Sequence, residues 1–435
     1  MTTPQAPTPE QDSTSALSDS ELTAIAPEVM ANDLGEYFRA WGQRIRNGES
    51  GALPVMAGMI GIIIFFQLER SVFLTDGNLV NLFVEAAIYV MIGAAETFVL
   101  LLSEIDLSLG YGIGVAGFVV AELIAPPVSL PWWLGVLGGI GAMAILGGLQ
   151  GTLISRLGLP SFIVTLGGQL GFLGLMQEVA NADSNAVGGV IQISPSSPIY
   201  KLVNSNMSTG LAWIALVVCL ALFTAFTLSR GRSRRAKGLT TAPIGVAILT
   251  IALTAAGGVA LVLICNANRG HAVAPLRGMP WVIPFVLLVL LAYSWLLSRT
   301  RIGRYIYAVG ANPEAARRAG INVKWVITFG FIMSSVTAGL AALVYESNLG
   351  SMSIDIDGGQ LVLFAVAAAV IGGTTLFGGR GRMINALLGG IVIAVVFNGL
   401  ALMGVGAAVQ EMVTAVVLIA AVALDALVRR RSTIR

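Results

Sequence analysis

The sequence predicts an all-α membrane protein, a polytopic transmembrane bundle of about twelve helices. Of the 435 residues, 56% are hydrophobic and 11% are charged, whereas a soluble domain carries about 25% charged residues. Apolar runs of about 20 residues recur along the chain, which is the length a helix needs to cross the hydrocarbon core. Too few polar side chains remain to cover a surface exposed to water, so we expect the bundle to lie in a membrane.

The N-terminal segment divides into two parts. Residues 1–32 are rich in Ser, Thr, Pro, Ala, Asp and Glu without apolar periodicity, which predicts a disordered cytoplasmic tail. Residues 33–47 predict an amphipathic helix at the membrane surface, because apolar residues recur at helical spacing after a capping pattern at Asp33 and Glu36. A docking element for another subunit is the alternative for this helix. No cleavable signal peptide is visible.

Residues 53–428 are the predicted membrane domain. The third, fifth and tenth of its spans are short or rich in glycine, which predicts half-helices or broken helices. The twelve candidate spans lie at 53–69, 79–102, 109–125, 131–154, 162–180, 210–228, 242–265, 280–298, 325–345, 360–377, 384–404 and 409–428.

The positions of the basic residues predict the orientation of these spans. Cytoplasmic loops of membrane proteins carry the excess of Lys and Arg. If the N-terminus is cytoplasmic, 21 of the 25 Lys and Arg lie on the cytoplasmic side of the membrane. The four on the outer side are Arg70, Lys201, Arg269 and Arg277. We therefore expect both termini, including a basic tail at 429–435, to be cytoplasmic. The two polar outer loops, 181–209 and 346–359, are either contact surfaces or ordinary connectors.

The residues of several kinds of site are missing from the sequence. None of the three lysines follows a glycine, so a phosphate-binding loop is absent. The lone His271 and the separated Cys219 and Cys265 provide neither a catalytic triad nor a metal site. We therefore expect no cofactor, no nucleic-acid partner and no chemistry on this chain, which leaves transport rather than a lipid-modifying enzyme.

Residues 299–324 interrupt two apolar spans with a short polar helix. Asn312, Pro313 and Glu314 form a helix start with an N-cap, a proline at the first position and an acid in the first turn. Arg317 and Arg318 suit the last turn, and Gly320 suits the position after the helix end. A helix of about two turns needs a packing partner. The small face of Ala315 and Ala316 allows close approach of a cytoplasmic motor, although a helix lying on the membrane surface is the alternative.

This stretch and three others resemble one family of transporters. The segment GRYIYAVGANPEAARRAGINV, with Gly310, resembles the cytoplasmic coupling loop of ribose/xylose-type permeases of bacterial ATP-binding-cassette (ABC) importers. The stretches SEIDLSLG (103–110), LPSFIVTLGG (159–168) and AVIGGTTLFGGRG (369–381) agree in the same order, as does FNGLALMGV (397–405). The extra helix pair around SRGRSRRAKG makes the chain most similar to the D-xylose permeases.

The resemblance implies a type II-like ABC importer permease in the bacterial inner membrane. Its implied partners are two ATP-binding subunits that dock on the helix near 310–321, an extracytoplasmic sugar-binding protein, a second permease copy and membrane lipid. The implied cargo is a monosaccharide, by resemblance xylose or another sugar. The implied coupling residues are Gly310, Asn312, Glu314, Ala315, Ala316, Arg317 and Gly320.

Polar residues within the spans are candidates for the translocation pathway, because ionisable groups inside a membrane usually face protein or a water-filled cavity. Asp106 either caps the following helix or contacts sugar directly, and Phe162 and Thr165 either line the pathway or pack. The candidates are Glu96, Glu104, Asp106, Ser108, Phe162, Thr165 and Asn398. The alternative function is an ion-coupled secondary transporter that uses Glu96 or Asp106 as a proton relay.

Overall fold

The structure, a computed structural model, describes most of the predicted membrane domain. The described residues are 53–182, 186, 188–236, 243–270, 275–416 and 419, with 35, 36, 39 and 42 ahead of them. The predicted tails at 1–32 and 429–435 lie outside the described residues. Most of the predicted helix at 33–47 and His271 also lie outside them.

Eight of the described helices are long and apolar enough to cross a membrane. They are α4 (Asp76–Leu100), α6 (Trp132–Leu157), α7 (Ser161–Ala182), α9 (Thr209–Ala236), α10 (Ile244–Asn266), α11 (Val282–Arg299), α14 (Val323–Leu349) and α16 (Met383–Leu402). Shorter apolar helices are α3 (Leu53–Glu69), α5 (Leu109–Ile124), α15 (Gly358–Ile371) and Ala407–Val416. Each helix coincides with one predicted span, so the prediction of an all-α polytopic bundle is confirmed.

The third and tenth predicted spans are short, as expected, but the prediction for the fifth is wrong. Helix α7 is continuous over 22 residues despite glycines that include Gly171, whose missing side chain would meet nothing within 4 Å. Glycine is tolerated within a helix in a membrane because the helix satisfies its own backbone polar groups where no water is available.

The chain divides into two compact units. One contains Ala215–Val259, and the other contains Ser50–Ile214 and Ala260–Arg435. Within the first unit, a side chain at Gly258 of α10 would overlap Leu216 of α9, so the glycine permits close packing of this helix pair. Helix α9 continues to Ala236, so most of the basic stretch SRGRSRRAKG, which follows the predicted span at 210–228, is helical rather than a loop. All sites described below belong to the second unit.

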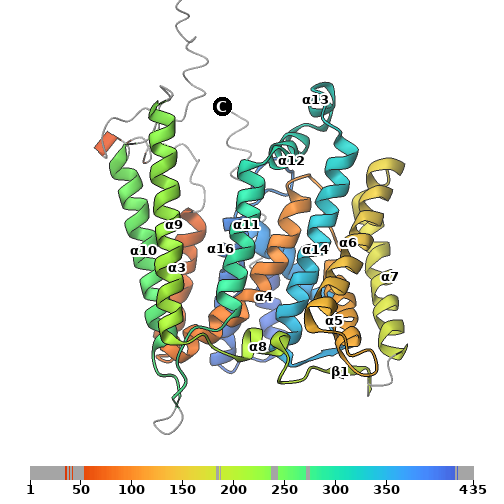
Figure 1. The fold of residues 1–435 in the computed structure, drawn as a ribbon, viewed down its shortest axis with the longest axis horizontal. Coiled ribbons are helices and arrows are strands. Elements are labelled where there is room, and N and C mark those ends of the chain that lie inside the picture. Colours follow the sequence, from red (N-terminus) through yellow and green to blue (C-terminus); the bar gives the residue numbers. More distant parts are fainter. Residues whose placement is uncertain are drawn as a thin grey trace, which may run out of the picture. The chain divides into compact units, whose positions relative to one another are not determined.

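Helix α4 is the central element of the second unit. It packs against α14, α15, α16 and α11, and α14 packs in turn against α6. Figure 1 shows α4 among α11, α14 and α16. From Ala86 to Leu100 its buried side chains form a nearly continuous run, as expected for a helix that is surrounded by protein rather than lipid.

The two short helices α5 and α15 meet at their N-termini. A side chain at Gly110 would overlap the backbone of Gly358, and one at Gly358 would lie 2.6 Å from Cγ of Tyr111. Non-helical segments lead into both helices, 101–108 into α5 and 350–357 into α15. Irregular backbone at membrane depth is tolerated where protein encloses it or a cavity hydrates it. We therefore interpret α5 and α15 as half-spans, short helices whose N-termini meet at the contact between Gly110 and Gly358.

A small sheet joins the two predicted outer loops. Strands β1 (Val190–Gln192) and β2 (Ser351–Ser353) pair antiparallel, with Val190 opposite Ser353. Helix α8 (Pro198–Asn204) is tied to the end of α14, where Asn204 donates to the carbonyl oxygen of Ser347 at 2.6 Å. The predicted loop 346–359 begins only after Leu349, because α14 continues through Glu346.

Candidate functional site

The polar interruption at 299–324 forms two consecutive helices, α12 (Arg301–Ala311) and α13 (Pro313–Arg318). The predicted start of α13 is confirmed. The Asn312 side chain accepts from the backbone N–H of Ala315 at 2.9 Å, and Pro313 occupies the first turn, where its missing N–H costs no hydrogen bond. The cap thus separates α13 from α12 at a single extended residue. Figure 1 shows α13 at one end of its unit, opposite β1 and α8.

The end of α13 is a Schellman motif centred on Gly320. The Ile321 N–H donates to the carbonyl oxygen of Ala316, and the Gly320 N–H donates to that of Arg317, both at 3.0 Å. Gly320 has φ +81°, a conformation that glycine adopts without the steric penalty of a side chain. Both ends of this six-residue helix are therefore held by local hydrogen bonds, as its sequence predicts.

The charges on α13 form one exposed cluster. Glu314 accepts from Arg317 at 2.8 and 3.0 Å and from Arg318 at 3.2 Å. These hydrogen bonds, the largest from Arg317, hold the pKa of Glu314 below its ordinary value. Since the folded pKa is the lower one, the contacts stabilise the helix above the ordinary glutamate pKa. That contribution is lost as the pH falls through the lowered value.

The alanine face of α13 differs from the expected one. Ala316 is 4% exposed and points into its own chain, whereas Ala315 and Ala319 are exposed. The expectation that Ala316 belongs to an outward face is therefore wrong. The reason is that successive helical positions differ by about 100°, so a six-residue helix on a protein surface must turn one alanine inward to pack.

Helix α12 attaches α13 to the membrane helices. Thr300 caps it by accepting from the Gly303 N–H at 3.1 Å. The Tyr307 hydroxyl donates to the carbonyl oxygen of Gly381 at 2.8 Å. Burial raises the pKa of Tyr307, so the hydroxyl keeps the proton it donates. This bond joins α12 to the loop between α15 and α16.

Five residues from three separate segments meet at the end of α12, and we call Leu101, Ser103, Gly310, Gly378 and Gly379 the glycine junction. A side chain at Gly310 would overlap the carbonyl oxygen of Leu101, and the Gly379 N–H donates to that same oxygen at 3.0 Å. The Ser103 hydroxyl donates to the carbonyl oxygen of Gly310 at 3.2 Å. Because three backbone segments are in close contact here, α12 has little room to move relative to segment 101–108 or to the loop before α16.

Two contacts at or near the glycine junction had no clear signal in the sequence. Ser103 adopts φ +65°, which is uncommon for a residue other than glycine, and its hydroxyl also bonds the carbonyl oxygen of Phe377 at 2.8 Å. Tyr307 was likewise not predicted as a contact. The glycines at 310, 378 and 379 were a usable signal of close approach in two of the three segments, but glycine patterns do not indicate which segments meet.

A second group of residues forms a buried polar cluster, comprising Glu96, Asp106, Ser108, Gln150 and Ser334. Asp106 accepts from the N–H of Ser108 at 3.0 Å and from its hydroxyl at 2.6 Å. Gln150 donates to the Ser108 hydroxyl at 2.9 Å, and Ser334 lies 3.5 Å from Asp106. Glu96 accepts from the Asp106 N–H at 3.5 Å. All five are buried, so the cluster holds the non-helical segment 101–108 between α4, α6 and α14.

The other predicted pathway residues are distributed around this cluster rather than within it. Thr165 is buried and donates to the carbonyl oxygen of Ser161 at 2.9 Å. Phe162 is 54% exposed on α7, and Glu104 is half-buried beside Ser161. The motif at 159–168 therefore packs against the segment at 101–108.

Asn398 belongs to a different part of the bundle. It accepts from Asn78 at 2.8 Å and donates to Glu85 at 3.4 Å, which links α16 to the beginning of α4. Asn78 precedes Glu96 by 18 positions on the same helix, about 27 Å at 1.5 Å per residue. Asn398 and Asp106 consequently do not form one site.

The arrangement around Asp106 predicts a structural effect of removing its carboxylate. We expect Asp106→Ala to lower the free energy of unfolding by about 1–3 kcal/mol, because the buried Ser108 donors lose their acceptor. Asp106→Asn should have a smaller effect, since its amide oxygen can still accept. Thermal unfolding of the purified chain in detergent measures both, with Asp355→Ala at an exposed aspartate as the control. Equal stability of Asp106→Ala and Asp355→Ala would contradict the expectation.

The described residues contain no group of three or more His, Cys, Asp or Glu side chains placed to hold a metal ion.

Comparison with known proteins agrees with this architecture. Residues 78–422 match the family described as the branched-chain amino acid transport system/permease component. The chain is 30% identical over 369 residues to the D-allose transport system permease protein of Escherichia coli strain K12, covering 85% of this chain and 89% of that protein. It is 32% identical over 381 residues to the xylose transport system permease protein of the same strain, covering 87% and 92%.

A further relative is the ribose import permease protein of that strain, which is 27% identical over 370 residues, with 84% and 92% covered. No solved structure matches the chain. The family match spans α4 to α16, and the relatives align over almost their whole length. The chain is therefore a multi-pass membrane protein that belongs to this permease family, together with the permeases of bacterial sugar ABC importers.

Proposed function

We propose that the chain is the transmembrane permease subunit of an ATP-driven, binding-protein-dependent importer of a monosaccharide, with α13 as the helix that couples it to separate ATPase subunits. The carrying observation is that α13 exposes Ala315 and Ala319 on one side. On the other side, α12 is attached to the glycine junction. The relatives named for allose, xylose and ribose transport support the choice of a sugar, with xylose the first candidate.

The proposed assembly has two copies of this chain, two ATP-binding subunits and an extracytoplasmic sugar-binding protein in the bacterial inner membrane, with both termini cytoplasmic. Movement of an ATPase subunit displaces α13, and α12 carries the displacement to the glycine junction. From the junction the displacement reaches segment 101–108, which leads into α5. It also reaches the loop between α15 and α16. The coupling helix is held in place by Gly310, Asn312, Glu314, Arg317 and Gly320. Ala316 packs it against the rest of the chain.

The test is co-purification without crosslinking, followed by transport. We expect ATP-binding subunits and a soluble sugar-binding protein to accompany the chain, and uptake into proteoliposomes to require both, with inhibition by vanadate. Sugar uptake by the purified chain alone, or uptake abolished by a protonophore while ATP is present, would overturn the proposal.

The ion-coupled alternative makes the opposite prediction for Glu96. One carboxylate oxygen of this fully buried residue has no hydrogen-bond partner, and a proton relay would use such a group. For the importer, we expect Glu96→Gln to keep ATP-dependent uptake within a few-fold of wild type, because the amide has the same size. Complete loss of uptake in a variant that folds and still hydrolyses ATP would favour the relay.

A further inference from the structure

We propose that the cavity between α15 and the helix Ala407–Val416 is a water-filled sugar-passage site, in which Gln360 and Glu411 bind hydroxyl groups beside the ring of Phe364. The inference rests on the proposed function and names the place within this chain where the neutral sugar is contacted. Only two of its lining residues, Asp357 and Gly359, lie in a segment that the sequence offered as a contact surface, the outer loop 346–359.

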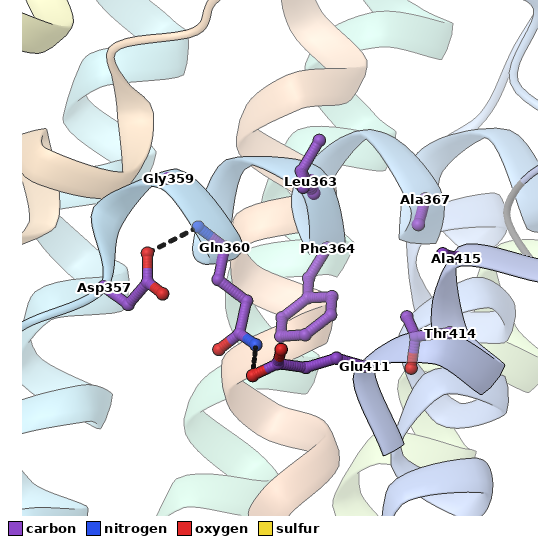
Figure 2. Close-up of a pocket in the computed structure, with 9 residues that line it drawn as sticks. All are labelled: Asp357, Gly359, Gln360, Leu363, Phe364, Ala367, Glu411, Thr414 and Ala415. Carbon is purple, nitrogen blue, oxygen red and sulfur yellow. Dashed lines mark hydrogen bonds between the residues drawn. The ribbon is translucent and has the colours of Figure 1, made fainter. Parts of the chain in front are cut away.

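The cavity has a volume of about 330 Å³, near the lower end of the range of small-molecule sites. The Gln360 side chain donates to Glu411 at 3.1 Å, and its backbone N–H donates to Asp357 at 2.9 Å. Figure 2 shows Phe364 beside the Gln360–Glu411 bond, with Thr414 on the facing helix. Carboxylate, amide and aromatic groups thus converge on one hollow from two elements.

The position of Glu411 argues against exposure of the cavity to lipid. Glu411 is exposed on an apolar helix whose neighbouring Met412 and Val416 are 61% and 66% exposed. Apolar side chains can face lipid, but a carboxylate inside a membrane is unfavourable unless it faces protein or a hydrated cavity. The pair Gln360 and Glu411 therefore faces protein or a hydrated cavity rather than hydrocarbon. The proposal takes the hydrated cavity, because a volume of about 330 Å³ adjoins the pair.

The chemistry of the lining favours a neutral polyol. No lysine or arginine is among the described residues that line the cavity, so a carboxylate or phosphate ligand would lack a cation. A monosaccharide can donate hydroxyl hydrogens to Glu411 and Asp357. Phe364 is 6% exposed and forms one wall of the cavity; its ring makes edge-on contacts with Phe397 and Tyr89, at centroid distances of 5.1 and 5.5 Å. This wall is thus held in place before sugar arrives.

The cavity also lies beside the point where the short helices α5 and α15 meet. Asp357 caps α15, and the next residue, Gly358, is the one that contacts Gly110 at the start of α5. Transport sites are commonly formed where discontinuous helices begin. Gln360 lies in the first turn of α15, whose far end leads to the loop that contacts α12. A displacement at the glycine junction is therefore transmitted along one short helix to the cavity.

The first test measures water access without requiring transport. In a chain carrying Cys219→Ser and Cys265→Ala, we expect Thr414→Cys to react with a charged methanethiosulfonate reagent in intact membranes. Ile145→Cys, at a 67% exposed apolar position of α6, should remain unreactive. Saturating D-xylose, D-ribose or D-allose should slow the reaction at position 414. Absence of labelling there, protection by none of these sugars, or a spontaneous disulfide between two chains in place of labelling would overturn the inference.

The second test separates this inference from the proposed function. We expect Glu411→Gln and Gln360→Leu each to reduce ATP-dependent sugar uptake roughly tenfold, as for loss of a hydrogen bond to a charged or buried group. Binding-protein-stimulated ATP hydrolysis should persist. Glu178→Gln and Gln177→Leu, at exposed positions of α7, are the matched controls. Wild-type chain without ATP-dependent uptake would contradict the function, whereas uptake unchanged in the cavity variants alone would overturn only the site.

Discussion

Ala315→Glu is expected to abolish binding-protein-stimulated ATP hydrolysis and sugar uptake while leaving the fold of the chain intact. Ala315 is exposed on α13, so a longer, charged side chain there can extend into solvent without displacing the core of the chain. In a partner interface, however, an unpaired carboxylate that loses its water costs about 2–5 kcal/mol, which is more than tenfold in affinity. Hydrolysis by the assembled complex and co-purification of the ATPase subunits measure the effect.

The matched control is Ala315→Ser, which keeps the small size and should support near-normal transport. Ala316→Glu is a poor test of coupling, because Ala316 is buried and a carboxylate there would displace α13 from its own chain. Full uptake by Ala315→Glu, in a complex that still contains the ATPase subunits, would contradict the proposal that α13 is the coupling helix.

Gly310→Ala is expected to unfold or distort the glycine junction and to eliminate transport. The added carbon would overlap the carbonyl oxygen of Leu101 and lie 2.8 Å from the backbone nitrogen of Gly379. Overpacking in a close-packed interior costs about 1–3 kcal/mol, and here the neighbours are backbone atoms that cannot rotate away. Thermal unfolding in detergent should show a lower midpoint, and uptake should fall even at temperatures where the variant is folded.

Gly171→Ala provides the comparison for this substitution. Gly171 is also a helical glycine, in α7, but a side chain there would meet nothing within 4 Å. Alanine favours a helix over glycine by about 1 kcal/mol, so this variant should be unchanged or slightly more stable. If Gly310→Ala matched Gly171→Ala in midpoint and transport, the three backbones would not be in close contact at the junction.

Local features of the molecule were predicted well because their causes are local. Hydrophobic runs of sufficient length identify the membrane helices, since the cost of exposing backbone to lipid is set within each segment. The start and end of α13 follow from Asn312, Pro313 and Gly320, whose effects on backbone conformation act within one turn. The continuity of α7 was missed because glycine lowers helix propensity in water, whereas a membrane removes water as a competitor for the backbone.

The sequence by itself determined that this protein is a multi-pass helical membrane protein with a capped polar helix between two spans, because hydrophobicity and capping are read over a few residues. The permease family was indicated by the resemblance of its motifs. Only the tertiary structure decided that Leu101, Gly310 and Gly379 share one contact and that Ala315 rather than Ala316 faces outward. It also decided that Gln360 and Glu411 line one cavity. Those relations join segments far apart in the chain, and their geometry depends on how all the helices pack together rather than on any one segment.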